Sequence, residues 1–156
     1  MKKEINKSLS VKFIDYDHQN GYPSEYKIRK WARKAYLGQN KTSVNIKLAS
    51  VNEMKSLNKK YFNKKKPCNV LSFPDVLTQS SQSGFLGDII ICGDVVKRES
   101  RKYNIDSDKR WAHMVVHSML HLQGYDHILK KNKQTMEKKE IYLMNQIGFS
   151  NPYYEN

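Results

Sequence analysis

Short runs in which apolar and polar side chains alternate predict the strands of this chain. Alternation with a period of two puts every second side chain on the same face of a sheet. Residues 9–16 (LSVKFIDY) and 44–48 (VNIKL) alternate in this way, and residues 69–73 (NVLSF) form a third run that Pro74 closes. Residues 86–92 (LGDIIIC) are nearly continuously apolar, which favours a central strand covered on both faces. We therefore expect about four strands.

Apolar residues that recur every three or four positions predict the helices. The first runs from Ser24 to about Leu37, and the second runs to about Phe62 from an N-cap at Asn52. Three further helical patterns cover residues 94–103, 107–123 and 131–146. Strands alternate with helices first, and helices dominate the end of the chain. This order favours an α+β (mixed α/β) fold in which a four-stranded mixed sheet packs against helices.

No feature of the sequence divides the chain into separate parts. The 156 residues contain no internal repeat, Pro-rich linker or low-complexity tract, so we treat 1–156 as a single small domain. Residues 75–84 are rich in Ser and Gln and predict a loop. Cys68 and Cys92 form no C-x-x-C pair, and we expect both to be reduced packing residues.

Neither a targeting signal nor a membrane span is predicted. The N-terminal residues are partly basic but lack the apolar stretch of a signal peptide. No run approaches the roughly 18 apolar residues that a membrane span needs. We therefore expect a cytoplasmic location and no membrane partner.

The chain is strongly basic. It has 28 Lys and Arg against 15 Asp and Glu, a formal net charge of +13. Such an excess favours polyanionic partners, because each neutralised phosphate releases condensed counterions. Most of the basic residues are Lys, and Asn is also plentiful. Coding bias can produce the same composition, in which case the charge is a solvated surface.

Three of the five histidines fall in the segment HSMLHLQGYDH, residues 117–127. The helix that carries the first two is expected to begin near Ser107, a good N-cap. His117 and His121 are four residues apart, so their imidazoles share one helix face. Zinc-binding helices of the HExxH type use this spacing. The same helix should pack against the sheet through an apolar face that includes Trp111, Val115, Met119 and Leu122.

The third metal ligand is expected to be His127 rather than His113. His113 and His121 would lie about 12 Å apart along the helix axis, and zinc–nitrogen bonds of about 2.0–2.1 Å cannot span that gap without strain. Gly124 can reverse the chain at the helix end and return His127 toward the last turn. Three histidines leave a fourth position open for water, as in catalytic zinc sites. The alternative is that these are ordinary surface or satisfied core histidines.

A general base is not evident. Ser118 occupies the position of the HExxH glutamate, which disfavours a metallopeptidase. Asp126 could orient an imidazole through its second nitrogen, or it could be a turn residue. Without a protein base, a metal can itself lower the pKa of a bound water and polarise a phosphoryl oxygen. The catalytic residues therefore stay unassigned.

The segment HSMLHLQGYDH resembles the H-G-x-L-H-L-x-G-Y-D-H signature of the YbeY family of bacterial endoribonucleases and rRNA maturation factors. The resemblance extends over about residues 44–147. The other blocks that carry it are Leu57-Asn58…Tyr61, Pro67…Asn69-Val70-Leu71-Ser72-Phe73-Pro74, Leu86-Gly87-Asp88-Ile89 and Glu99.

The resemblance implies a mixed α/β fold and one zinc ion held by His117, His121 and His127. It also implies cleavage of single-stranded RNA during small-subunit rRNA maturation and ribosome quality control. The implied partners are ribosomal RNA precursor and the small ribosomal subunit, and no DNA partner is expected.

One departure from the family pattern concerns the substrate cleft. The family usually has Arg directly after the residue that matches Tyr61, and here that residue is Phe62. Lys64, Lys65 and Lys66 are candidate RNA-binding residues that could substitute, although a Lys lacks the bidentate grip of Arg. The departure keeps a second function open, that of a ribosome-binding assembly factor with a mainly structural zinc and weak or no cleavage.

Overall fold

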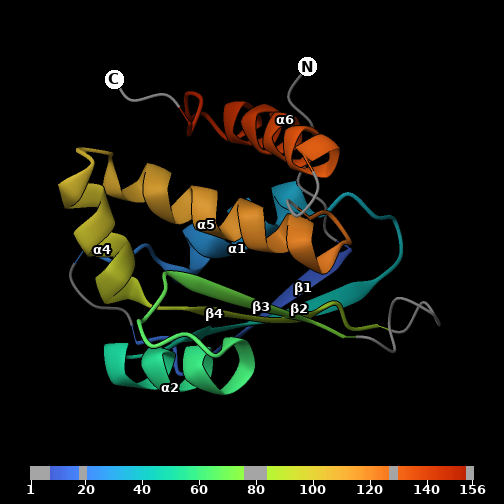
Figure 1. The fold of residues 1–156 in the computed structure, drawn as a ribbon. Coiled ribbons are helices and arrows are strands. Elements are labelled where there is room, and N and C mark those ends of the chain that lie inside the picture. The colour runs from blue at the N-terminus through green and yellow to red at the C-terminus, as the bar shows by residue number, and fades with distance from the viewer. Residues whose placement is uncertain (1–7, 18–20, 76–83, 127–129, 154–156) are drawn as a thin grey trace.

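A computed structural model describes residues 8–17, 21–75, 84–126 and 130–153 of the protein (Figure 1). The strands described there form one four-stranded sheet with the order β1-β2-β4-β3. Strands β1, β2 and β4 are parallel, and β3 pairs antiparallel with β4. Their bounds are β1 Leu9–Ile14, β2 Thr42–Leu48, β3 Val70–Pro74 and β4 Gly87–Ile91. The predicted mixed sheet and the interior position of its most apolar strand are therefore confirmed.

The alternation of side chains explains how the sheet is covered. In β2, Val44 and Ile46 are fully buried on one face, and Ile46 pairs in register with Ile89 of β4. Ile89 and Ile91 belong to the main core on that face, whereas Ile90 packs into a smaller core on the other. Strand β4 is apolar on both faces because both faces are covered.

The helices lie in layers on the two faces of the sheet. Figure 1 shows α2 on one face and α1, α4 and α5 on the other, with α6 packed outside α5. The helix bounds are α1 Glu25–Ala35, α2 Val51–Phe62, α4 Gly93–Lys102, α5 Ser107–Leu122 and α6 Lys130–Gln146. Each predicted helix is present to within a few residues. Most of the predicted loop at 75–84 lies outside the described residues.

Two predicted N-caps are wrong. Ser50, not Asn52, caps α2, because its hydroxyl and the Glu53 carboxylate form a reciprocal capping box with each other's backbone N–H groups. Asp106, not Ser107, caps α5 through its side chain, which accepts a hydrogen bond from a first-turn N–H group. In each case a residue slightly earlier in the chain offers the better-placed acceptor.

Helix α5 is the central element of the main core. The four apolar residues predicted to face the sheet are all buried: Trp111, Val115, Met119 and Leu122. A contact between Lys27 of α1 and Asp108, with Nζ and Oδ2 2.8 Å apart, adds an exposed ion pair between these two helices. Cys68 and Cys92 are free thiols of the smaller core, as predicted. Among the described residues, no helix is both long and apolar enough to cross a membrane.

Candidate metal centre

His117 and His121 meet on the open side of α5. Their Nε2 atoms are 3.1 Å apart, and their rings are nearly perpendicular at 79°. Two nitrogens bound to one tetrahedral zinc ion would lie about 3.3 Å apart, given zinc–nitrogen bonds of about 2.0–2.1 Å. The spacing of four residues thus brings two imidazole nitrogens close to the separation that one ion needs. Imidazole nitrogen is also a donor that zinc prefers.

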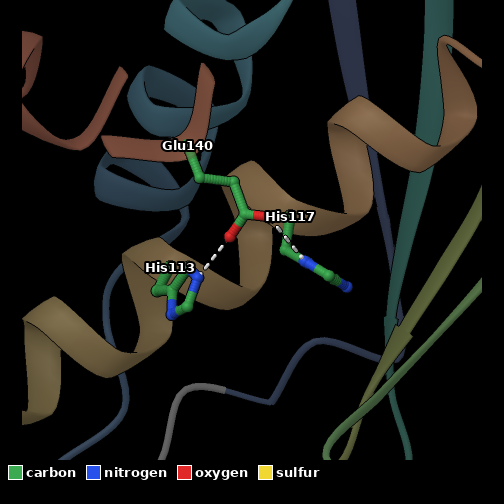
Figure 2. Close-up of side chains that lie close together, drawn as sticks. All are labelled: His113, His117 and Glu140. Atoms are coloured by element: carbon green, nitrogen blue, oxygen red, sulfur yellow. Dashed lines mark hydrogen bonds and ion pairs between the residues drawn. The ribbon is translucent and has the colours of Figure 1, made fainter. Parts of the chain in front are cut away.

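A buried carboxylate on α6 holds the first of these histidines. Figure 2 shows Glu140 between His113 and His117. Its Oε1 lies 3.1 Å from Nδ1 of His117, and its Oε2 lies 2.5 Å from Nε2 of His113. The Tyr153 hydroxyl also donates to Oε2, at 2.7 Å. Glu140 therefore joins two histidines of α5 to the C-terminal segment.

The electrostatics of this network favour an ionised Glu140. Burial raises its pKa, but the hydrogen bonds from His113 and His117 outweigh that effect and lower the pKa to about 2. Burial lowers the pKa of His113, more than the nearby carboxylate raises it. A neutral His113 then donates its Nε2–H to the carboxylate. Burial and the hydrogen bond to Glu140 both raise the pKa of Tyr153, which keeps its hydroxyl protonated as a donor.

The hydrogen bond to Glu140 also sets the tautomer of His117. An ionised carboxylate is only an acceptor, so Nδ1 of His117 carries the proton and Nε2 carries the lone pair. That lone pair lies on the ring edge that meets His121. Metal-binding histidines commonly donate their other N–H to a carboxylate in this way. The geometry thus presents His117 as an Nε2 ligand.

The three residues drawn in Figure 2 are themselves a possible ligand set. The donor atoms of His113, His117 and Glu140 all lie within 4.8 Å of one another, so this cluster could hold a metal ion. However, the contact of 2.5 Å between Nε2 of His113 and Oε2 of Glu140 is a hydrogen-bond distance. It is well below the separation of about 3.3 Å expected for two ligands of one tetrahedral ion. These distances therefore fit better with His113 and Glu140 as a hydrogen-bonded network that supports His117 than with both of them as ligands of one ion.

The third predicted ligand, His127, lies outside the described residues. The ligand set of His117, His121 and His127 therefore stays a prediction, of which the structure brings the first two together. Asp126 accepts hydrogen bonds from the Asn132 side chain at 3.2 and 3.4 Å. The carboxylate that orients His117 is Glu140. Whether Asp126 orients another imidazole stays a prediction.

The histidine pair opens into a pocket of about 580 Å³. Its walls come from α2, β3, α5 and the segment that follows α6. They include Lys64 and Arg110, and Arg110 is held by Glu99 at 3.1 Å. Of the predicted RNA-binding residues, Lys64 lines the pocket, whereas Lys65 and Lys66 are exposed outside its lining. Their role in RNA binding stays a prediction.

No carboxylate lines this pocket among the described residues. Ser118, in the place of the HExxH glutamate, is fully buried in the core, and its hydroxyl makes no hydrogen bond there. A base at that position would therefore be directed away from the pocket. The structure gives no support to a metallopeptidase.

Sequence reasoning did not identify Glu140 or Tyr153. One signal was available for Glu140, because it occupies the buried stripe of α6 together with Met136, Leu143 and Met144. A charged residue in such a stripe requires buried partners. Nothing in the spacing of residues could have named His113 and His117 as those partners, because they lie 27 and 23 positions earlier in the chain.

Comparisons with known proteins identify the family of this chain. A family model described as endoribonuclease YbeY matches residues 13–148. The chain is 38% identical over 155 residues to the endoribonuclease YbeY of Buchnera aphidicola subsp. Schizaphis graminum (strain Sg), covering 99% of this chain and 98% of that protein. It is 39% identical over 134 residues to that of Wigglesworthia glossinidia brevipalpis, covering 85% and 88%.

A solved structure is also similar. The solution structure of TM1509 from Thermotoga maritima matches with a TM-score of 0.59 and 25% identity, covering 88% of this chain and 89% of that one. The family model and the curated relatives each span most of the chain and carry the same description. An endoribonuclease role, and with it an RNA substrate, follows from that description. The chain belongs to the endoribonuclease YbeY family.

Proposed function

We propose that this protein is a zinc-dependent endoribonuclease that cuts single-stranded RNA. In this proposal it acts in the cytoplasm on ribosomal RNA precursor, in maturation of the small ribosomal subunit and in ribosome quality control. The observation that carries the metal-dependent chemistry is the pair of Nε2 atoms of His117 and His121, 3.1 Å apart at a pocket of about 580 Å³. Membership of an endoribonuclease family supports the RNA substrate.

The chain itself supplies the ligands, their orientation and the positive charge. His117 and His121, with His127 as the predicted third ligand, would hold one zinc ion. Glu140 keeps the proton of His117 on Nδ1 and so directs its Nε2 to the ion. A bound zinc lowers the pKa of a coordinated water and polarises a phosphoryl oxygen. Lys64 and Arg110 line the pocket wall, and their positive charge would attract the phosphates of the strand.

Zinc suits this donor set, and the proposed activity suits the pocket. Three imidazoles with no cysteine ligand are typical of catalytic zinc sites that keep one position open. Among the described residues the pocket lining has no Asp or Glu. The wall therefore adds no negative charge to repel a phosphodiester. The volume is also in the range of about 300–1,000 Å³ that ligand pockets usually have.

A second function is favoured by one observation. Phe62 lines the pocket where the family usually has Arg, so the bidentate phosphate grip of Arg is missing there. If cleavage needs that grip, the protein is instead a ribosome-binding assembly factor whose zinc is mainly structural and whose cleavage is weak or absent. Lys64, two residues after Phe62, offers only a point charge in the same pocket.

Incubation with an rRNA precursor separates the two functions. The zinc-loaded wild type should produce discrete cuts in single-stranded regions, and His117→Ala should produce none, because that variant loses a ligand. The comparison variant is His113→Ala, which removes an imidazole one turn earlier on α5 from outside the predicted ligand set and should still cut the RNA when it is fully loaded with zinc. Binding of the precursor by the wild type without any cut would contradict the nuclease and favour the assembly factor.

A further inference from the structure

An exposed aromatic cluster lies beside the pocket into which His117 and His121 open. Phe62, the last residue of α2, is 48% exposed and lines the pocket. Its neighbour Tyr61 is 53% exposed. The other large hydrophobic side chains that are exposed in the described part of the chain are all tyrosines: Tyr26, Tyr103, Tyr142 and Tyr153. Phe62 differs from all of these in having no hydroxyl group to hydrate.

The two exposed rings are held by a third. The ring of Phe73, on β3, lies 6.2 Å from the ring of Phe62 at an interplanar angle of 35°. It lies 5.1 Å from the ring of Tyr61 in an edge-to-face arrangement at 64°. Phe73 is itself partly buried against the smaller core. A helix end and a strand therefore fix the cluster of Tyr61, Phe62 and Phe73, rather than a loop.

Two lysines, Lys60 and Lys64, lie near this aromatic cluster. The Lys60 ammonium group lies 5.2 Å from the centre of the Tyr61 ring. Beyond the helix end, Asn63 adopts a left-handed conformation, with φ of 53°, and turns the chain. The backbone N–H of Lys64 then donates to the Asn58 carbonyl, at 3.2 Å, and Lys64 lines the same pocket as Phe62. The turn thus places a cation and an exposed phenyl ring together.

We propose that Phe62, supported by Phe73 and Tyr61, is a stacking site for a nucleobase of the single-stranded RNA that enters the metal pocket. In complexes with single-stranded RNA, bases stack on aromatic side chains while lysines neutralise the adjoining phosphates. Here the Phe62 ring and Lys64 line the same pocket. A base in a duplex is already stacked and paired. A stacking site beside the metal therefore selects single strands over duplex RNA. The inference rests on the proposed function for its RNA substrate.

The first test measures the affinity of the zinc-loaded full chain for short single-stranded RNA oligonucleotides. Phe62→Leu keeps an apolar side chain but removes the aromatic face, and we expect it to raise the Kd by roughly 5- to 150-fold, the range for loss of one stacked base. The matched control is Tyr26→Leu, because Tyr26 is 70% exposed on α1 and is absent from the pocket lining. It should bind as the wild type does. Equal thermal melting of both variants excludes a folding defect, and gel analysis of the recovered RNA excludes cleavage during the measurement.

The second test asks whether the contact is with a base. Oligonucleotides that lack one base at successive positions should bind the wild type more weakly at one position, and Phe62→Leu should be insensitive to that loss. Phe62→Trp supplies a direct signal, because the two native tryptophans are buried and a bound base should quench the new indole. Quenching by the intact oligonucleotide that is lost with the abasic one supports stacking.

The outcomes separate this inference from the proposed function. If the wild type binds with the expected base dependence but never cleaves, the stacking site stands and the nuclease fails. If the wild type cleaves but Phe62→Leu binds equally well with no penalty for any missing base, the stacking site fails and the nuclease stands. The exposed aromatic cluster would then be left as a protein-docking surface.

Discussion

The carboxylate of Glu140 decides how His117 can act. It is 1% exposed in its side chain and accepts hydrogen bonds from His113, His117 and Tyr153. Three donors stabilise the ionised form of a group that burial alone would neutralise. One consequence is structural, because the C-terminal segment is tied to α5. The other is chemical, because the Nε2 of His117 keeps a lone pair that is available to a metal ion.

Glu140→Gln tests this role. A glutamine amide is neutral and can orient its NH2 group toward His117, so the variant should no longer fix the tautomer. We expect metal affinity to fall by about 10- to 100-fold, the usual cost of losing such an outer partner, while one equivalent still binds at saturation. Competition with a chromogenic chelator measures the affinity. Glu137→Gln, the same charge change three residues earlier on α6, is the control.

Two results would contradict the assignment of Glu140. Complete loss of stoichiometric binding would make Glu140 a ligand, as the cluster of His113, His117 and Glu140 permits. Unchanged affinity would show that the hydrogen bond at 3.1 Å does not influence the metal.

At the scale of elements, α5 places its functional residues on a face that the core does not use. The residues Trp111, Val115 and Met119 are fully buried against the sheet, whereas the His117 side chain remains 25% exposed. The row of histidines at every fourth position runs from the interior outward, from a buried His113 to the open pair of His117 and His121. The outer end of the helix therefore carries the two predicted ligands that the structure brings together.

Metal analysis of histidine variants tests which end of the row binds. His121→Ala and His127→Ala should each lose most of the bound zinc after dialysis, because each removes a predicted ligand. His113→Ala should retain about one equivalent, with a lower affinity because Glu140 loses one of its donors. If His113→Ala empties the site and His127→Ala does not, the ligand set is that of the buried cluster and the predicted set is wrong.

Local signals in the sequence explain how much of the fold and of the site could be predicted. Strict alternation identified β2, and continuous apolar character placed β4 inside the sheet, because each pattern reports directly on burial of a face. The i, i+4 spacing likewise predicted that His117 and His121 converge. The N-caps of α2 and α5 were misplaced, since several adjacent Ser, Asn and Asp residues could each cap and only the geometry selects one. Glu140 and Phe73 act through contacts distant in sequence, which no local period encodes.

At the scale of the whole molecule, the fold brings the pocket together from distant parts of the chain. Phe62 ends α2, Asn69 precedes β3, Arg110 and the histidines belong to α5, and Tyr153 follows α6. Helix α5 on one face of the sheet carries two of the predicted metal ligands, and α2 lies on the other face. The Phe62 ring at the end of α2 lines the same pocket. The chain as a whole has a net charge of +13, which suits a polyanionic strand. The fold thus brings two predicted metal ligands, basic side chains and an exposed aromatic ring together at one pocket.

A zinc titration of the metal-stripped protein tests most directly whether it is a one-zinc endoribonuclease. Cleavage of a single-stranded RNA is followed at each addition. The stripped protein should be inactive, because the chain offers no carboxylate base at the described pocket wall. The cleavage rate should then rise in proportion to zinc and level off at one equivalent, and a duplex of the same sequence should be cut far more slowly. Cleavage that is independent of zinc, or no cleavage at any zinc concentration, would show that this protein is not a one-zinc endoribonuclease.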